Sequence, residues 1–287
     1  MFAYNMNRSW ALNDNNFGIW ERLKIATVFL TPRNRWTQGE RVLEFESKLA
    51  RFTGNKYAVF VSSGSTANTL LASYLRDKGN DDRNLVVFPS STWATSINPF
   101  IRERFDPIFL DISLKDLSID LNLLENYLEV NHKKTACVFI TSLLGIAPNI
   151  ARLKFIEGRY PDVKFWMDNC EATFTDYNNL NISSYFTSTS STYFSHQLQS
   201  VEGGFVLTND KDIYEYCVLC RSHGLTRALP DKNDIKNPLV DSLFDFYLVG
   251  NNYRNTDINA RIGLLDFAKI KQSKLYRKDL YSIFLHN

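Results

Sequence analysis

Short apolar runs alternate with amphipathic stretches through the first part of the chain. The β-rich runs have the length of buried strands and lie at residues 57–61, 85–88, 107–111, 135–141 and 164–168. Apolar residues at helical spacing between them predict helices at 65–77, 93–102, 122–130 and 149–160. This repetition predicts an α/β fold, with a mostly parallel sheet and helices on both faces.

The pattern continues less regularly after residue 168. Residues 185–193 and 205–208 are predicted strands on either side of a loop that contains His196. Predicted helices follow at 210–223 and 257–271, separated by a polar loop at 229–240. Ligands of parallel sheets gather at the carboxyl ends of the strands, and the polar motifs of this chain fall at such ends.

Composition narrows the class of protein. The chain has 287 residues, 44% of them hydrophobic, which is enough for a full core and long for one domain. A formal charge of +2 gives no signature of nucleic-acid or membrane-surface binding. The longest apolar runs, such as 136–140, are strand-sized, and the polar N-terminus has no leader pattern. We therefore expect a cytoplasmic protein.

The four cysteines support a reducing compartment, because their spacing shows no disulfide framework. Cys217 and Cys220 form a CxxC pair inside a predicted helix. A metal or redox site is the alternative, but no second pair accompanies them, so we interpret both thiols as core residues and expect no metal.

Three features suggest a ligand at the strand ends. The segment SSGSTAN at 62–68 links a predicted strand to a helix, where small residues and free N–H groups bind anions, or simply cap the helix. Trp93 follows the next strand and either stacks on a heterocycle or belongs to the core. Asp168 ends an apolar strand, where a carboxylate needs a cationic partner or caps the following turn.

The most informative segment is STYFSHQL at 191–198, followed by EGG at 202–204. It looks like the loop that carries the cofactor-binding lysine of pyridoxal-phosphate (PLP) enzymes, with His196 in the place of the lysine. No lysine stands between Asp168 and Gly203. An imidazole of near-neutral pKa therefore replaces the usual covalent attachment point.

Together with SLLG at 142–145, DNCE at 168–171, RSHG at 221–224 and GNNYR at 250–254, these motifs resemble the DegT/StrS-type sugar-nucleotide aminotransferase family. The likeness is greatest to its lysine-less 3-dehydratase branch and covers roughly residues 36–270. It implies a fold-type-I large domain of three α/β/α layers. We expect an N-terminal segment at 1–35, this large domain at 36–271, and at 272–287 the start of a small C-terminal domain that is largely missing.

The resemblance also implies roles for single residues. The cofactor phosphate is expected to contact Gly64, Ser65, Thr66 and Ser191, and Asn252 to reach the phosphate of the neighbouring subunit. For the ring, the resemblance implies stacking by Trp93, pairing of its nitrogen with Asp168, and Glu171 near its hydroxyl. Arg254 and His223 are expected near the substrate or the carboxylate of the amino donor.

The implied activity is that of a PLP- or pyridoxamine-phosphate (PMP)-dependent lyase. It would remove the C3 hydroxyl of a nucleotide-linked 4-keto-6-deoxy sugar, of the GDP-4-keto-6-deoxymannose type, with His196 as acid and base and glutamate as amino donor. Such enzymes act as homodimers in deoxysugar and O-antigen (lipopolysaccharide) biosynthesis.

Two alternatives stay open: a sugar aminotransferase that uses another lysine, and a non-catalytic homologue that serves as a partner subunit. The shortened C-terminus favours the second. An interpretation of His196 as a loss-of-function replacement of the lysine would favour it as well. Ile146 and the glycine-free stretch 176–184 also depart from the family pattern.

Overall fold

The computed structural model describes residues 17–30, 35–80, 82–229 and 237–286. The chain divides into two compact units, residues 1–34 and 35–287. The described part of the first unit contains helix α1, Ile19–Leu30. All other elements belong to the second unit.

The second unit is built on a sheet of seven strands, in the spatial order β1-β9-β8-β5-β4-β2-β3 within the described residues. The strands are β1 Tyr57–Val61, β2 Leu85–Pro89, β3 Asp106–Leu110, β4 Thr135–Thr141, β5 Lys164–Asp168, β8 Thr187–Ser191 and β9 Gly204–Thr208. Strand β9 is antiparallel to both of its neighbours, and the remaining pairs are parallel. Six of these seven strands therefore point their carboxyl ends to the same edge.

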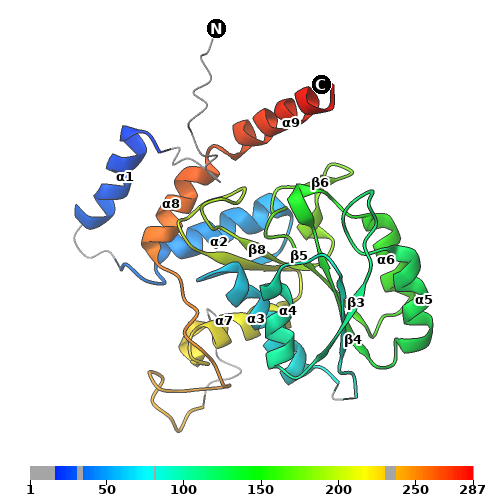
Figure 1. Ribbon diagram of the computed structural model, residues 1–287. Coiled ribbons are helices and arrows are strands. Elements are labelled where there is room, and N and C mark those ends of the chain that lie inside the picture. Colours follow the sequence, from blue (N-terminus) through cyan, green and yellow to red (C-terminus); the bar gives the residue numbers. More distant parts are fainter. Residues whose placement is uncertain (1–16, 31–34, 81, 230–236, 287) are drawn as a thin grey trace. The chain divides into compact units, whose positions relative to one another are not determined.

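Helices cover both faces of this sheet. They are α2 Glu40–Thr53, α3 Gly64–Lys78, α4 Ala94–Arg102, α5 Leu121–Asn131, α6 Ile150–Arg159, α7 Lys211–Arg221 and α8 Asp257–Phe267. A further helix, α9 Ile270–His286, follows α8 and is mostly exposed. Alternate residues of each strand pack to opposite sides. Helices α3, α4 and α7 share one core, whereas α5 and α6 cover one part of the other face and α2 and α8 another (Figure 1). The predicted three-layer architecture is confirmed.

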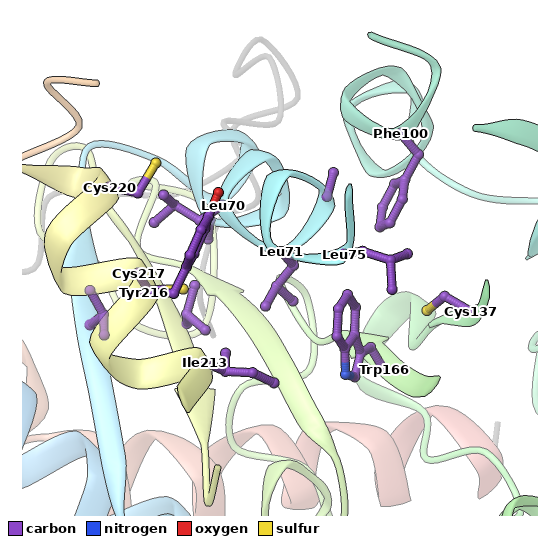
Figure 2. Close-up of a cluster of buried hydrophobic side chains, with 14 of the residues drawn as sticks. Leu70, Leu71, Leu75, Phe100, Cys137, Trp166, Ile213, Tyr216, Cys217 and Cys220 are labelled. Atoms are coloured by element: carbon purple, nitrogen blue, oxygen red, sulfur yellow. The ribbon is translucent and has the colours of Figure 1, made fainter. Parts of the chain in front are cut away.

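Both cysteines of the CxxC pair are buried in the hydrophobic core that α3 and α7 share. Figure 2 shows Cys217 beside Tyr216 on α7, facing Leu70 and Leu71 of α3. Burial raises the pKa of the Cys217 thiol well above its usual range and that of Cys220 to about 11. Neither thiol is ionised at neutral pH, and a thiolate is the form that binds metals and acts as a nucleophile. The two cysteines are packing residues, as their helical context predicted.

Most predicted boundaries agree with the structure, but some segments differ, and helix α1 was not predicted. The predicted helix at 257–271 ends at Phe267, and the chain resumes as α9 at Ile270. Strand β8 is shorter than predicted because a 3-10 turn at Ile182–Ser184 precedes it. Helix α2 was not predicted. The predicted loop at 229–240 falls largely outside the described residues.

The glycine-free stretch contains a further element that was not predicted, a two-stranded hairpin. Strands β6 Asp176–Tyr177 and β7 Leu180–Asn181 pair antiparallel across Asn178 and Asn179. Both asparagines adopt positive φ, at 50° and 63°. Asparagine tolerates this region better than most residues, so it takes the place of the glycines expected in such a turn.

A buried ion pair joins α2, β1 and α7. Arg221 is 3% exposed, and its Nη1 donates to Glu46 Oε1 at 2.5 Å and to the Phe60 carbonyl at 2.8 Å. Glu46 Oε1 also accepts from the Phe60 N–H at 2.8 Å. A buried charge is tolerated when it is paired and hydrogen-bonded in this way.

We predict that Glu46→Gln lowers the free energy of unfolding by about 3 kcal/mol, because Arg221 keeps a buried charge without its counterion. Glu44→Gln on the same helix is the matched control. Glu44 pairs with the more exposed Arg41 and Lys48, so its loss should cost no more than about 1 kcal/mol. Urea unfolding measures both, and equal effects would contradict the prediction.

Candidate active site

Segments distant in sequence meet at the carboxyl ends of β1, β5 and β8. A Cβ atom on Gly64 would lie 2.7 Å from Cys170 Sγ and 3.0 Å from Ser191 Cβ. A Cβ on Gly204 would lie 2.4 Å from the Gly64 nitrogen. Gly204 requires glycine because its backbone lies against that of Ser63 and Gly64, whereas a side chain on Gly64 would meet the side chains of Cys170 and Ser191. The structure thus brings Gly64, Ser191 and the Asp168 turn together.

The N-terminus of α3 presents free N–H groups at this point. Ser63 caps the helix: its hydroxyl accepts from the Thr66 N–H at 3.1 Å, and its own N–H donates to Thr66 Oγ1 at 2.9 Å. The N–H groups of Gly64 and Ser65 have no acceptor within the helix, as is general for a first turn. An anion here would bind Gly64 and Ser65. Thr66 contributes to the cap with both its N–H and its hydroxyl.

Asp168 lies at the end of β5 and is only 4% exposed. Its Oδ2 accepts from Ser96 Oγ at 2.6 Å and from Asn68 Nδ2 at 3.0 Å. Its Oδ1 accepts from the Cys170 N–H at 3.0 Å. Three donors therefore balance the cost of burying this carboxylate.

Trp93 and Glu171 lie on loops that follow β2 and β5. Trp93 is the N-cap residue of α4 and is 71% exposed, so its ring is a free aromatic surface rather than part of the core. Glu171 Oε2 accepts from the Leu144 N–H at 2.7 Å. Leu144 has a φ of 53°, and this bond fixes the left-handed turn of the SLLG segment.

The loop that carries His196 is closed at its base. The Thr192 N–H donates to the Gly203 carbonyl at 2.8 Å, and the Ser200 N–H donates to the Thr192 carbonyl at 2.9 Å. Next to His196, Gln197 Oε1 accepts from the Phe174 N–H at 2.8 Å. These bonds, which are independent of any ligand, hold the loop against the turn after β5.

His196 has the properties of a proton-transfer group. Burial lowers the pKa of its imidazole, and the carboxylates of Glu171 and Asp168 oppose that shift. The ring is therefore neutral at physiological pH and can accept a proton. Its Nδ1 is buried and has no hydrogen-bonding partner among the described residues. A buried polar atom without a partner is unusual in a folded protein and is frequent at functional sites.

Asn252, Arg254 and His223 form a connected cluster beside β1. Arg254 Nε donates to Asn252 Oδ1 at 2.9 Å, and Arg254 Nη2 lies 3.2 Å from His223 Nε2. The Ser62 N–H donates to the Tyr253 carbonyl at 3.0 Å. The cluster is thus fixed next to the turn that leads into α3.

The sequence analysis assigned no role to several residues that organise the site. Asn255 is buried and its Nδ2 donates to the carbonyls of Val61, at 2.8 Å, and Glu202, at 3.1 Å. It therefore ties the end of the His196 loop to β1. Asn68 and Ser96 bind Asp168, as described above. Asn68 stands in the quoted SSGSTAN motif, whereas Ser96 has no sequence signal.

The arrangement fits PLP or PMP. The free N–H groups of α3 suit a phosphate, Asp168 keeps an acceptor position on Oδ1, and Trp93 offers an exposed aromatic face. The Nδ1 of His196 is buried without a hydrogen-bonding partner among the described residues. The described residues contain no group of three or more candidate metal-ligating side chains. None of the described helices has both the length and the apolar character to span a membrane.

Comparison with known proteins finds relatives that cover nearly the whole chain. GDP-4-keto-6-deoxy-D-mannose 3-dehydratase of Escherichia coli O55:H7 is 32% identical over 279 residues, covering 93% of this chain and 70% of the relative. A solved structure of the E. coli 3-dehydratase with bound hydrated PLP has a TM-score of 0.82 at 30% identity, covering 92% of this chain and 68% of that one. A further structure of this dehydratase, with a trapped PLP-glutamate geminal diamine, has a TM-score of 0.83 at 30% identity, covering 92% and 69%.

The family model of the DegT/DnrJ/EryC1/StrS aminotransferases matches residues 22–287, nearly the whole chain. The solved dehydratases share the fold of this chain, with TM-scores of 0.82 and 0.83, so sequence and fold agree. The chain belongs to the DegT/DnrJ/EryC1/StrS aminotransferase family.

Proposed function

We propose that the chain is a PLP/PMP-dependent sugar-nucleotide 3-dehydratase, which removes the C3 hydroxyl of a 4-keto-6-deoxy sugar linked to a nucleotide. The observation that carries the proposal is His196, a buried imidazole on a lysine-free loop beside Asp168 and Glu171. The 32% identity to GDP-4-keto-6-deoxy-D-mannose 3-dehydratase supports the GDP-4-keto-6-deoxymannose type of substrate.

Each site residue has a defined task in this reaction. When bound, the cofactor's pyridine ring supplies an electron sink. Gly64 and Ser65, with Thr66 and Ser191 beside them, bind the phosphate through the helix N-terminus. Asp168 keeps the ring nitrogen protonated, Trp93 covers the ring, and Glu171 lies near the ring hydroxyl.

His196 moves the proton. Its neutral ring takes a proton from the aminomethyl carbon of PMP and gives a proton to the C3 hydroxyl as that group leaves. Lowering of its pKa by burial favours the neutral form that the first step needs. Arg254 and His223 are proposed to bind the sugar nucleotide or the carboxylate of glutamate, the amino donor, as suggested by the PLP-glutamate adduct of the related dehydratase.

The proposal extends to domains, assembly and location. We assign residues 36–271 to the PLP/PMP-binding large domain and 272–287 to the start of the C-terminal domain. The enzyme is proposed to be a cytoplasmic homodimer of deoxysugar and O-antigen biosynthesis, and the four described cysteines are free. A sugar aminotransferase is disfavoured by the lysine-free interval, and a non-catalytic partner subunit by the intact set of site residues.

We predict that Asp168→Asn slows the conversion of bound PLP to PMP by glutamate about 10²-fold, because a charge partner of the ring nitrogen in a buried site is lost. The fold should remain intact, since the amide oxygen of the introduced asparagine still accepts hydrogen bonds. Stopped-flow absorbance measures the rate, with the exposed Asp162→Asn as control. An unchanged rate in Asp168→Asn would remove the role of Asp168.

The decisive test of the proposed function is substitution of His196. His196→Asn should lower dehydration about 10²- to 10⁴-fold, the usual worth of a positioned acid/base group, and leave PLP affinity nearly unchanged. His196→Lys should form a covalent lysine–cofactor adduct that borohydride makes permanent, visible by mass spectrometry. His132→Asn is the control, because His132 binds the Leu128 carbonyl outside the site. Full turnover in His196→Asn would disprove the mechanism.

We also predict that Asn252 serves the site of the partner subunit. Asn252 is exposed, and the segment before it exposes large apolar side chains, including Leu239 and Val249, the latter 89% exposed. Such a patch marks an interaction surface. Chains carrying His196→Asn and chains carrying Asn252→Ala, each impaired alone, should regain activity when mixed, because one site of each mixed dimer is intact. If Asn252 serves its own subunit, mixing restores nothing.

A further inference from the structure

The two oxygens of Asp168 have different surroundings. Oδ2 accepts two hydrogen bonds, from Ser96 Oγ at 2.6 Å and Asn68 Nδ2 at 3.0 Å. Among the backbone N–H, hydroxyl and amide groups of the described residues, only the Cys170 N–H donates to Oδ1, at 3.0 Å; the Cys170 thiol also interacts with this carboxylate. A carboxylate oxygen accepts about two hydrogen bonds. Oδ2 is therefore saturated by the protein, whereas Oδ1 keeps one position for a further donor.

Three contacts determine the orientation of the Asn68 amide. Its Nδ2 donates to Asp168 Oδ2 and to the Thr95 carbonyl, the latter at 3.1 Å. Its Oδ1 accepts from Thr189 Oγ1 at 2.6 Å. A flipped amide would face two acceptor oxygens with its own oxygen and would leave the buried Thr189 hydroxyl opposite an NH₂ group.

We propose that Ser96, Asn68 and Thr189 are positioning residues: Ser96 and Asn68 saturate Oδ2 of Asp168, Thr189 orients Asn68, and Oδ1 is thereby presented to the pyridine nitrogen of the cofactor. The inference rests on the proposed PLP/PMP function and adds the residues through which Asp168 acts. Thr189 pairs with Asp168 across the β5–β8 ladder, but its hydroxyl donates to the Asn68 amide and not to the carboxylate.

Rigid elements supply all three residues. Asn68 lies on α3, Ser96 in the first turn of α4 and Thr189 in β8. The Ser96 N–H also donates to the Trp93 carbonyl at 2.9 Å. The first turn of α4 therefore fixes the positions of both Trp93, the aromatic residue proposed to cover the ring, and Ser96, a donor to Asp168. Sites built on helices and strands in this way hold their geometry closely.

The first test separates orientation from packing at Thr189. Thr189→Val keeps the side-chain shape but loses the donor, and should raise the Kd of PLP roughly tenfold, the worth of one hydrogen bond in a buried network. Thr189→Ser keeps the donor but loses a methyl group, and should stay within about twofold of wild type. Thr187→Val is the matched control, because its hydroxyl pairs with Thr208 in the same sheet, away from Asp168; it should also bind PLP as wild type does.

The second test uses Ser96→Ala, which should raise the Kd of PLP by a similar, roughly tenfold, factor. In an Asp168→Asn background the same change should have no effect, since Ser96 acts through the carboxylate. Ser73→Ala is the control: Ser73 Oγ donates to the Glu103 carboxylate at 2.7 Å, outside the site. Fluorescence titration gives Kd, and the melting temperature of each cofactor-free variant reports its fold.

Several results would overturn the inference. A Thr189→Val variant that binds PLP like wild type would do so, as would a Thr189→Ser variant that weakens binding as much as Thr189→Val. Additive effects of Ser96→Ala and Asp168→Asn would also overturn it, while the proposed function stands. If the wild-type chain binds no PLP, the proposed function itself fails, and this inference with it.

Discussion

The burial of one carboxylate constrains the whole ligand-binding edge of the sheet. Asp168 is at the end of a central strand and almost fully removed from water, where a charge is stable only with donors around it. Those donors come from α3, α4 and the turn after β5. The same three elements carry Gly64, Trp93 and Glu171. Satisfying Asp168 therefore also sets the positions of the residues proposed to hold the cofactor.

Local sequence was enough to predict strands whose apolar runs have sharp polar ends. The bounds of β1, β4 and β5 are those predicted, because residue pattern and burial change together at their ends. Helix α2 was missed for a different reason. Its first N–H groups are capped by Asp257, which accepts from the Gly39 N–H at 2.8 Å across 218 residues of sequence. A cap supplied from so far away leaves no local start signal.

In the candidate site too, some residues could be predicted from local sequence and others could not. The glycine turn, Asp168 and the His196 loop were predicted because each is a short motif at a strand end, and the structure brings them together. Ser96 and Asn255 were not, because their importance lies in contacts with distant segments: Ser96 reaches Asp168 across 72 residues. Thr66 shows a further limit, since the motif that suggests phosphate binding is also a helix cap, and here Thr66 forms the cap. The motifs were enough to predict which residues could bind a cofactor or transfer a proton. The contacts that orient those residues could be found only from the tertiary structure.

The position of β1 has a consequence for the order in which the protein folds during synthesis. This strand lies at the edge of the sheet, and its single strand neighbour is β9, residues 204–208. The capping carboxylate of α2 is made later still, at residue 257. Strand β1 must therefore wait until residues 204–208 are synthesised, while β2, β3, β4 and β5 can already pair with one another. The strand pairs among β2 to β5 can therefore form before β9 is synthesised, whereas the turn between β1 and α3 gains its strand partner only after residue 208.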